Sequence, residues 1–273
     1  MQQSEIRRPV VAGQFYPSSA TALKNQIDSF VDKKIDKIDA LACMLPHAGY
    51  MYSGKVAALT VSRINIRKKI ILLGPNHTGN GAAFSIMTEG LWQTPLGQIK
   101  IDSILAKKIL ANSKYLEADT LAHAYEHSLE VELPFLQYFK TDFEIVPIAF
   151  LSDEIETLKE IGCQIADVLK GPDIKDSTLL VASSDMTHYE PQDEAQNKDK
   201  EAIEAILELN EDKLMQKIKR FNISMCGYAP VIVMLKIAKL LGAKQAELIK
   251  YQTSGDITGD RDSVVGYAGI IIH

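Results

Sequence analysis

Short apolar segments alternate with helical patterns along this chain, and this alternation constrains the fold more than any other feature. Each segment is apolar and bounded by polar residues or glycine, as expected of a strand that is buried on both faces. The segments are residues 41–45, 69–73, 144–150, 178–183, 246–253 and 263–272. A stretch punctuated by glycine and proline between residues 84 and 101 predicts a strand hairpin.

Helical periodicity fills several of the intervals between these segments. Asp153 is a candidate helix N-cap with Glu156 three residues later, and the apolar residues that follow recur on one helical face. Residues 193–209 and 230–241 show a similar pattern. Strands that alternate with helices form parallel sheets whose crossovers cover both faces. We therefore expect an α/β fold with a doubly wound, largely parallel central sheet flanked by helices, in a single domain over residues 1–273.

The composition excludes several classes of protein. Apolar residues make up 46% of the chain and charged residues 24%, which are globular proportions. The formal net charge of -5 argues against nucleic acid as a partner, because phosphate binding needs a basic surface. No apolar run approaches the roughly 20 residues that cross a bilayer, and the first residues lack the apolar core of a signal peptide. We expect a cytoplasmic protein with no membrane partner.

Cysteine is scarce in this sequence. The three cysteines, Cys43, Cys163 and Cys226, are far apart and form no Cys-x-x-Cys pair. This spacing fits neither a disulfide framework nor a cysteine-rich zinc site. We interpret them as buried thiols that behave as small apolar side chains.

Histidine and aspartate follow several of the predicted strands. His47 follows the first segment, His77 the second, Asp185 and His188 the segment 178–183, and Asp256 the segment 246–253. Doubly wound sheets bind ligands beyond the carboxyl ends of their strands. Two imidazoles and a carboxylate at that edge would suit a divalent first-row metal and leave coordination positions open. Alternatively, the histidines are hydrogen-bonded loop residues and the aspartates cap the helices that come next.

The string His123-Ala-Tyr-Glu126-His127 permits a different hypothesis. It matches the H-x-x-E-H pattern of zinc proteases, in which two histidines on one helix bind zinc and the glutamate is the base. An apolar stripe after residue 128 predicts a helix that begins near Glu126 or His127. In that case His123 lies in the preceding loop and cannot join the zinc site, so a zinc hydrolase is the third choice.

Six segments of the chain resemble the signature segments of the Memo family, called AmmeMemoRadiSam system protein B in prokaryotes. They lie in the family's order and span most of the chain: residues 12–17, 46–50, 74–77, 126–128, 183–189 and 263–268. The resemblance implies a fold similar to that of class III extradiol dioxygenases, which are non-haem iron enzymes. It also implies that His47 and His77 are metal ligands, and that His188 is the acid/base residue with Asp185 beside it.

The same resemblance implies further roles around this site. Glu126 and His127 match a polar pair near the family's site, and Tyr16 and Tyr50 lie within signature segments, so we expect these four residues to bind substrate. Animal relatives supply a cysteine as third metal ligand. The aligned loop here, residues 251–257, contains no cysteine, and Asp256 is its only side chain that could replace one.

The residues and what the resemblance implies together leave two hypotheses for the function. The first is a metal-dependent, dioxygenase-like enzyme in which Fe(II), or else Cu or Zn, acts on a phenolic or other small polar substrate. Its expected partners, beyond that small molecule, are the AMMECR-type and radical S-adenosylmethionine proteins of the same system. The alternative is a binding module whose histidine-lined pocket holds a phosphopeptide or another anion without catalysis.

Overall fold

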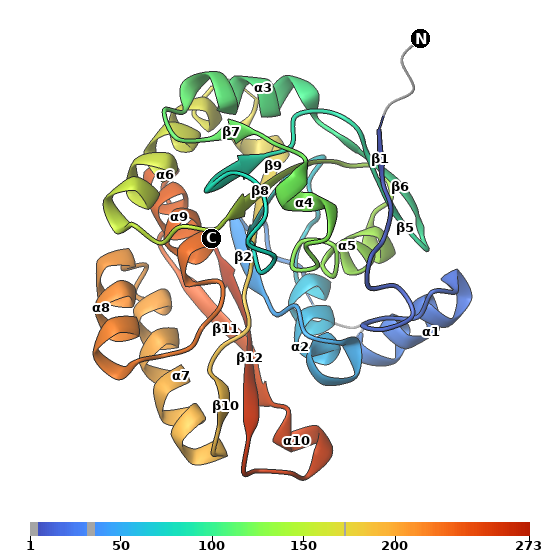
Figure 1. Cartoon of the computed structure of the whole chain (residues 1–273), viewed down its shortest axis with the longest axis vertical. Coiled ribbons are helices and arrows are strands. Elements are labelled where there is room, and N and C mark those ends of the chain that lie inside the picture. The colour runs from blue at the N-terminus through green and yellow to red at the C-terminus, as the bar shows by residue number, and fades with distance from the viewer. Residues whose placement is uncertain (1–4, 32–35, 172) are drawn as a thin grey trace.

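A mixed β-sheet organises the computed structural model, which describes residues 5–31, 36–171 and 173–273 (Figure 1). The sheet has twelve strands, nine of them in the order β1-β5-β6-β8-β3-β9-β2-β12-β10. Strand β11 pairs with β12, and β4 pairs with β7 and β8. The strands are β1 (Ile6–Arg7), β2 (Ala42–Leu45), β3 (Lys69–Pro75), β4 (Phe84–Ile86), β5 (Leu91–Thr94), β6 (Gly97–Ile101), β7 (Glu117–Ala118), β8 (Glu144–Phe150), β9 (Thr178–Ser183), β10 (His188–Glu190), β11 (Ala246–Thr253) and β12 (Val264–Ile272).

The centre of the sheet is parallel and is flanked by antiparallel pairs, while the edge strand β1 again pairs in parallel, with β5. Strands β6, β8, β3, β9 and β2 pair in parallel, with Leu73 opposite both Ile148 and Ala182. Strand β12 pairs antiparallel with β2, and β5 and β6 form the expected hairpin. The prediction of an α/β fold with a largely parallel central sheet is confirmed. Strands β8, β9 and β11 have the predicted bounds. Strands β8 and β9 lie between neighbours that bury their apolar residues, whereas β11 pairs with β12 alone.

Helices connect these strands and cover the sheet. They are α1 (Ala20–Phe30), α2 (Tyr50–Ser62), α3 (Ser103–Asn112), α4 (Leu121–Ala124), α5 (Leu133–Phe139), α6 (Ile155–Leu169), α7 (Gln192–Leu207), α8 (Glu211–Phe221), α9 (Tyr228–Leu240) and α10 (Gly255–Thr258). The predicted cap of α6 was wrong by one residue. Glu154 accepts hydrogen bonds from the N–H groups of Glu156 and Thr157, whereas Asp153 accepts one from the Tyr228 hydroxyl.

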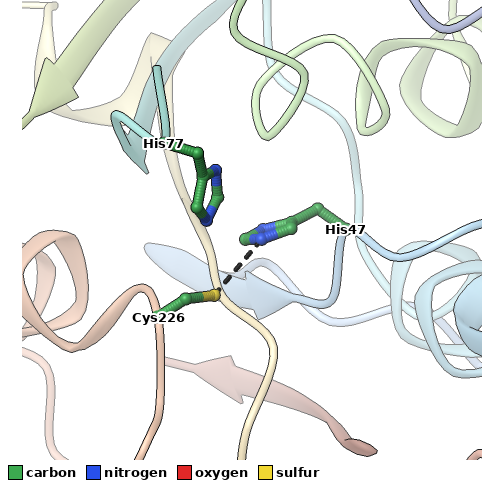
Figure 2. A group of neighbouring side chains, drawn as sticks. All are labelled: His47, His77 and Cys226. Carbon is green, nitrogen blue, oxygen red and sulfur yellow. Dashed lines mark hydrogen bonds between the residues drawn. The ribbon is translucent and has the colours of Figure 1, made fainter. Parts of the chain in front are cut away.

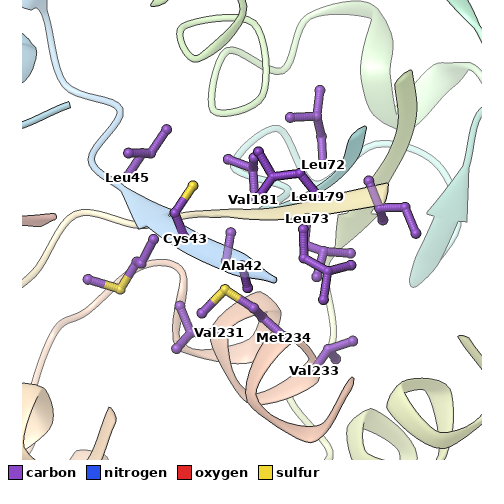
Figure 3. Packing of buried hydrophobic residues seen from close by; sticks show 14 of the residues in the cluster. Ala42, Cys43, Leu45, Leu72, Leu73, Leu179, Val181, Val231, Val233 and Met234 are labelled. Atoms are coloured by element: carbon purple, nitrogen blue, oxygen red, sulfur yellow. The ribbon is translucent and has the colours of Figure 1, made fainter. Parts of the chain in front are cut away.

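The helices form two layers with the sheet between them. Helices α1, α2 and α5 lie on one side, and α6, α8 and α9 lie on the other (Figure 1). Helix α9 packs directly under the parallel strands, where Val231, Val233 and Met234 meet apolar side chains of β2, β3 and β9 (Figure 3). Within the described ranges, no helix combines the length and apolar character needed to cross a membrane. Residues 1–4, 32–35 and 172 of the predicted domain lie outside the described part.

Candidate metal centre

Three neighbouring parallel strands end at the same edge of the sheet, and each is followed by a polar side chain of the predicted site. His47 lies two residues beyond β2, His77 two residues beyond β3, and Asp185 two residues beyond β9. Because β9 lies between β2 and β3, these side chains meet over its end. The structure therefore brings together residues that are far apart in the sequence, as the parallel topology requires.

A cysteine, Cys226, lies beside His47 and His77, and these three residues form the candidate metal group. Cys226, on the loop between α8 and α9, places its Sγ 3.2 Å from Nε2 of His47. One ligand atom each from His47, His77 and Cys226 lies within 4.8 Å of the other two, and Figure 2 shows the three side chains pointing at a common centre. Two imidazoles and a thiol at these separations are a set that can hold a metal ion.

Each histidine of this group is oriented through its Nδ1 atom. Nδ1 of His77 lies 3.0 Å from a carboxylate oxygen of Glu126, and Nδ1 of His47 lies 2.8 Å from the hydroxyl of Ser183. Both rings therefore direct Nε2 toward the centre, the orientation that a hydrogen bond at Nδ1 gives to metal-binding histidines. Burial and the neighbouring imidazoles lower the pKa of His47 well below its usual value, so its ring is neutral, as a ligand must be.

Glu126 is an orienting group in this arrangement. Its carboxylate accepts hydrogen bonds from the backbone N–H groups of His77 and Ser128 as well as from the His77 ring. Burial opposes ionisation, but these hydrogen bonds and the nearby His127 outweigh it and lower the pKa of Glu126 to about 2. Glu126, His77 and His127 also lie close enough to share an ion. The oxygens of Glu126 are already used by the hydrogen bonds to His77 and Ser128.

Asp185 and His188 line the pocket together with the two histidines. The Asp185 carboxylate accepts a hydrogen bond of 2.8 Å from the backbone N–H of His47, and burial raises its pKa to about 7. Nδ1 of His188 lies 2.9 Å from the carbonyl oxygen of Ser224 and donates to it, because a carbonyl can only accept. The remaining nitrogen of His188, Nε2, is therefore free to accept a proton.

A pocket of about 1030 Å³ opens onto these residues. His47, His77, His127, Asp185 and His188 all line it. None of the described residues that line this pocket is a lysine or an arginine. Aromatic rings form much of the remaining wall: Phe15, Tyr16, Tyr52, Tyr189 and Tyr267.

The substrate-binding residues expected from the resemblance differ in position. His127 lies in the pocket wall, where its ring stacks on His77 with centroids 4.9 Å apart. Tyr16 also lines the pocket, although its hydroxyl is bonded to Glu130. Tyr50 does not fit the expected role. It is fully buried, stacks on Phe135 and donates its hydroxyl hydrogen to the carbonyl of Val131, because α2 turns it into the core.

Asp256 is not brought to the metal group. It lies in the short helix α10, is exposed, and accepts hydrogen bonds from the N–H and hydroxyl of Thr253. Its carboxylate thus closes a turn between β11 and α10 from inside the helix, whereas the alternative interpretation placed it at a helix N-cap, a position that Ser254 occupies here. The expected third ligand, Asp256, is therefore not beside His47 and His77; the side chain that the structure places there is that of Cys226, which the sequence alone suggested only as a buried thiol.

The zinc-protease pattern is not realised, because its residues do not share one helix. Helix α4 ends at Ala124 and α5 begins at Leu133, so Glu126 and His127 lie in the segment between them and share no helix with His123. The His123 ring is fully buried and bonds through Nε2 to the Ser85 hydroxyl, 3.1 Å away. The helix predicted to start near Glu126 begins later than expected, because residues 126 and 127 have no regular structure and backbone turns occupy residues 128–132.

Sequence reasoning missed Cys226 because its neighbours in space are far away in the chain. The one local signal is Gly227, since a small residue before a helix permits close approach to another backbone. A Cβ atom at this position would lie 2.3 Å from the carbonyl oxygen of Ser183. That contact seats the cysteine loop on the end of β9.

Comparison with known proteins gives consistent matches along the chain. Residues 7–271 match the family model described as Memo-like protein. A MEMO1 family protein of Aquifex aeolicus is 45% identical over 270 residues, which cover 97% of this chain and 98% of that protein. A MEMO1 family protein of Methanosarcina mazei is 44% identical over 271 residues, covering 98% and 100%.

The structural comparison extends the likeness to a distant protein. The crystal structure of an uncharacterized protein from Escherichia coli K12 superposes with a TM-score of 0.57 at 15% sequence identity. The match covers 84% of this chain and 98% of that one. At this identity the likeness establishes a common fold and nothing more.

Proposed function

Since this chain belongs to the Memo family, we propose that it binds a metal ion through His47, His77 and Cys226 and uses it in a reaction on a phenolic or other small polar substrate. The observation that carries the proposal is the convergence of the three ligand atoms within 4.8 Å of one another. Both imidazoles have their Nδ1 atoms engaged elsewhere, which leaves Nε2 for the ion.

The donor set bears on the identity of the metal. Thiolate and imidazole donors suit Cu(I) and Zn(II), whereas two histidines and a carboxylate suit Fe(II). With Cys226 in place of Asp256, we put Cu and Zn ahead of Fe(II) as the resident ion. A bound ion would act as a Lewis acid that stabilises the oxyanion of an ionising hydroxyl group.

His188 is the residue proposed to take up the proton. Its Nε2 is free because Nδ1 donates to the Ser224 carbonyl, and the side chain lines the pocket. Burial lowers the pKa of His188, so the ring is neutral near pH 7 and ready to accept the hydrogen of a substrate hydroxyl. Asp185, which also lines the pocket, accepts a hydrogen bond from the backbone N–H of His47 and so helps to hold that ligand in place.

The lining of the pocket favours an uncharged aromatic substrate. Rings such as Tyr52, Tyr189 and Tyr267 provide flat apolar surface, and the absence of lysine and arginine among the described lining residues disfavours a phosphate group. The phosphopeptide-binding module is therefore the weaker hypothesis. A cytoplasmic location and association with AMMECR-type and radical S-adenosylmethionine proteins are further proposals that rest on the family resemblance.

Metal titration of matched variants tests the proposal. Purified protein is titrated with Cu(I), Zn(II) and Fe(II) under nitrogen, alongside His77→Ala, Cys226→Ala and the control Cys163→Ala. Cys163 is a half-buried cysteine on α6, so its variant removes a thiol without touching the site. We expect one tight ion in the parent and the control, and a loss of affinity on the order of 100-fold in the other two.

Circular dichroism shows whether each variant keeps its fold. A full equivalent of tightly held ion in both folded ligand variants contradicts the proposed site. A parent protein that binds none of the three ions with useful affinity contradicts metal dependence altogether and returns the pocket to a binding role.

A further inference from the structure

A carboxyl group lies behind the metal centre, in the interior of the protein. Glu132 is fully buried, and one of its oxygens, Oε2, has no hydrogen-bond partner. Its other oxygen lies 2.8 Å from the hydroxyl of Ser183. An unpartnered polar atom in the core costs free energy, so a carboxyl retained at such a place needs an explanation.

Ser183 connects this carboxyl to the metal centre. Its Oγ lies 2.8 Å from Glu132 Oε1, 2.8 Å from the carbonyl oxygen of Ser128 and 2.8 Å from Nδ1 of His47. Ser183 and Glu132 are fully buried, and His47 nearly so. The hydroxyl is therefore the middle member of a chain that runs from Glu132 to the ring of a proposed ligand.

The hydrogen atoms of this chain can be assigned. Ser183 has one hydroxyl hydrogen, and the carbonyl oxygen of Ser128 can only accept a hydrogen bond. The contact between Ser183 and Ser128 is therefore favourable only if the Ser183 hydroxyl donates its hydrogen to that carbonyl. Nδ1 of His47 must then donate to the hydroxyl oxygen. The third contact is satisfied if Glu132 carries a proton, and burial together with Asp185 raises the pKa of Glu132 well above its usual value.

We infer that Glu132 and Ser183 are positioning residues that hold His47 in the tautomer protonated at Nδ1, with the Nε2 lone pair directed to the metal centre. Ser183 fixes the tautomer, and Glu132 fixes the rotamer of Ser183. The inference rests on the proposed function for its use, since a fixed Nε2 lone pair serves an ion bound between His47, His77 and Cys226. His77 has its own orienting group in Glu126, so each imidazole is held from a different side.

The tautomer can be measured without metal, by long-range proton–nitrogen correlation spectra of the histidine rings in the apoprotein. The signals of His47 are identified by their loss in His47→Ala. We expect the Nδ1–H form alone in the parent protein and a population of the Nε2–H form in Ser183→Ala. Glu132→Gln should preserve the parent tautomer, since its amide can donate to Ser183, and Glu132→Leu should give a smaller admixture than Ser183→Ala.

Ser85→Ala is the matched control. Ser85 is also fully buried and also bonded to a histidine ring, that of His123, which lies apart from the metal group. Its removal should leave the His47 signals unchanged. In metal titrations, Ser183→Ala should bind Zn(II) about 10- to 100-fold more weakly than the parent, and Ser85→Ala should bind it equally well.

The outcomes separate this inference from the proposed function. An unchanged His47 tautomer in Ser183→Ala overturns the inference whatever the metal affinity. Parent-like spectra in Glu132→Leu overturn the part assigned to Glu132. A changed His47 tautomer with unchanged Zn(II) affinity in Ser183→Ala shows that the hydrogen bonds from Glu132 through Ser183 to His47 do not assist metal binding. If the parent protein itself binds no metal ion, the proposed function is refuted, whereas the result of the tautomer measurement still stands.

Discussion

At the scale of single residues, one buried carboxylate ties the beginning of the described chain to the metal centre. Glu130 pairs with Arg7, and it also accepts hydrogen bonds from the N–H groups of Val10 and Val11 and from the Tyr16 hydroxyl. Arg7 in turn donates to the backbone carbonyls of two residues in the segment that carries Glu126. The segment of residues 10–16, which forms one wall of the pocket, is thus held in place by its hydrogen bonds to the buried Glu130 carboxylate.

Removing Arg7 should therefore be costly. Arg7→Met keeps an apolar stem over Trp92 but leaves Glu130 as an unpaired buried charge. We expect a loss of about 3–5 kcal/mol in the free energy of unfolding, measured by urea denaturation. Arg63→Met is the control, because its ion pair with Glu247 is partly exposed and should cost less than about 1 kcal/mol. Equal losses in the two variants would contradict the role assigned to Arg7.

Asp256 provides a prediction of the opposite kind. Its carboxylate is exposed and engaged with Thr253, so Asp256→Ala should leave the affinity for Zn(II) and Cu(I) unchanged. The variant loses both hydrogen bonds from Thr253, and we expect it to be less stable by about 1 kcal/mol. Metal titration and thermal unfolding measure the two effects. A marked fall in affinity would show that this loop does reach the ion.

At the scale of elements, two helices begin immediately after residues of the metal group, and both have glycine at the N-cap. Gly49 precedes α2 and follows His47 closely, whereas Gly227 precedes α9 and follows Cys226. Their surroundings differ. A Cβ on Gly49 would meet no atom closer than 3.7 Å, whereas one on Gly227 would lie 2.3 Å from the Ser183 carbonyl oxygen.

This difference predicts contrasting effects of the same substitution. Gly227→Ala should push the cysteine loop away from β9, costing about 1–3 kcal/mol of stability and weakening metal binding. Gly49→Ala should be tolerated in both respects, since its φ of -56° suits any residue. Chemical denaturation and Zn(II) titration of the two variants provide the comparison. Parent-like metal affinity in Gly227→Ala would show that the loop position is unimportant.

The strands were predictable from the sequence because of where they lie. Strands β8 and β9 are buried on both faces, so their residues form unbroken apolar runs with clear ends. The histidines at the strand ends could be predicted as neighbours, since parallel topology brings the residues after each strand to one edge of the sheet. Cys226 could not, because it belongs to a loop between helices whose position depends on packing of α9 against the sheet.

At the scale of the whole molecule, Asp199 links three separate parts of the fold. It lies on α7, and its carboxylate accepts hydrogen bonds of 2.8 Å from the Thr187 N–H and 2.7 Å from the Tyr251 hydroxyl. These contacts join α7 to the loop before His188 and to β11. Burial outweighs the hydrogen bonds and raises the pKa of Asp199 above its usual value.

This raised pKa predicts how stability varies with pH. The folded protein retains the Asp199 proton at pH values where the unfolded chain, with a pKa of about 3.9, has lost it. Stability therefore falls as pH rises from that value to the raised pKa, and the contribution is constant above it. In Asp199→Asn this fall should disappear. Urea denaturation of both proteins across this range measures the difference, and a difference that does not vary with pH would contradict the assignment.

The pocket is walled by segments from opposite ends of the described chain. Phe15 and Tyr16 lie in the segment of residues 10–16, whereas Val265 and Tyr267 belong to β12. Strand β12 pairs with β2, which ends two residues before His47. All three proposed metal ligands precede β12 in the sequence, so the ribosome synthesises them before this wall of the pocket. On the proposed function, a nascent chain therefore presents its three ligands to metal ions before the pocket that encloses them has formed.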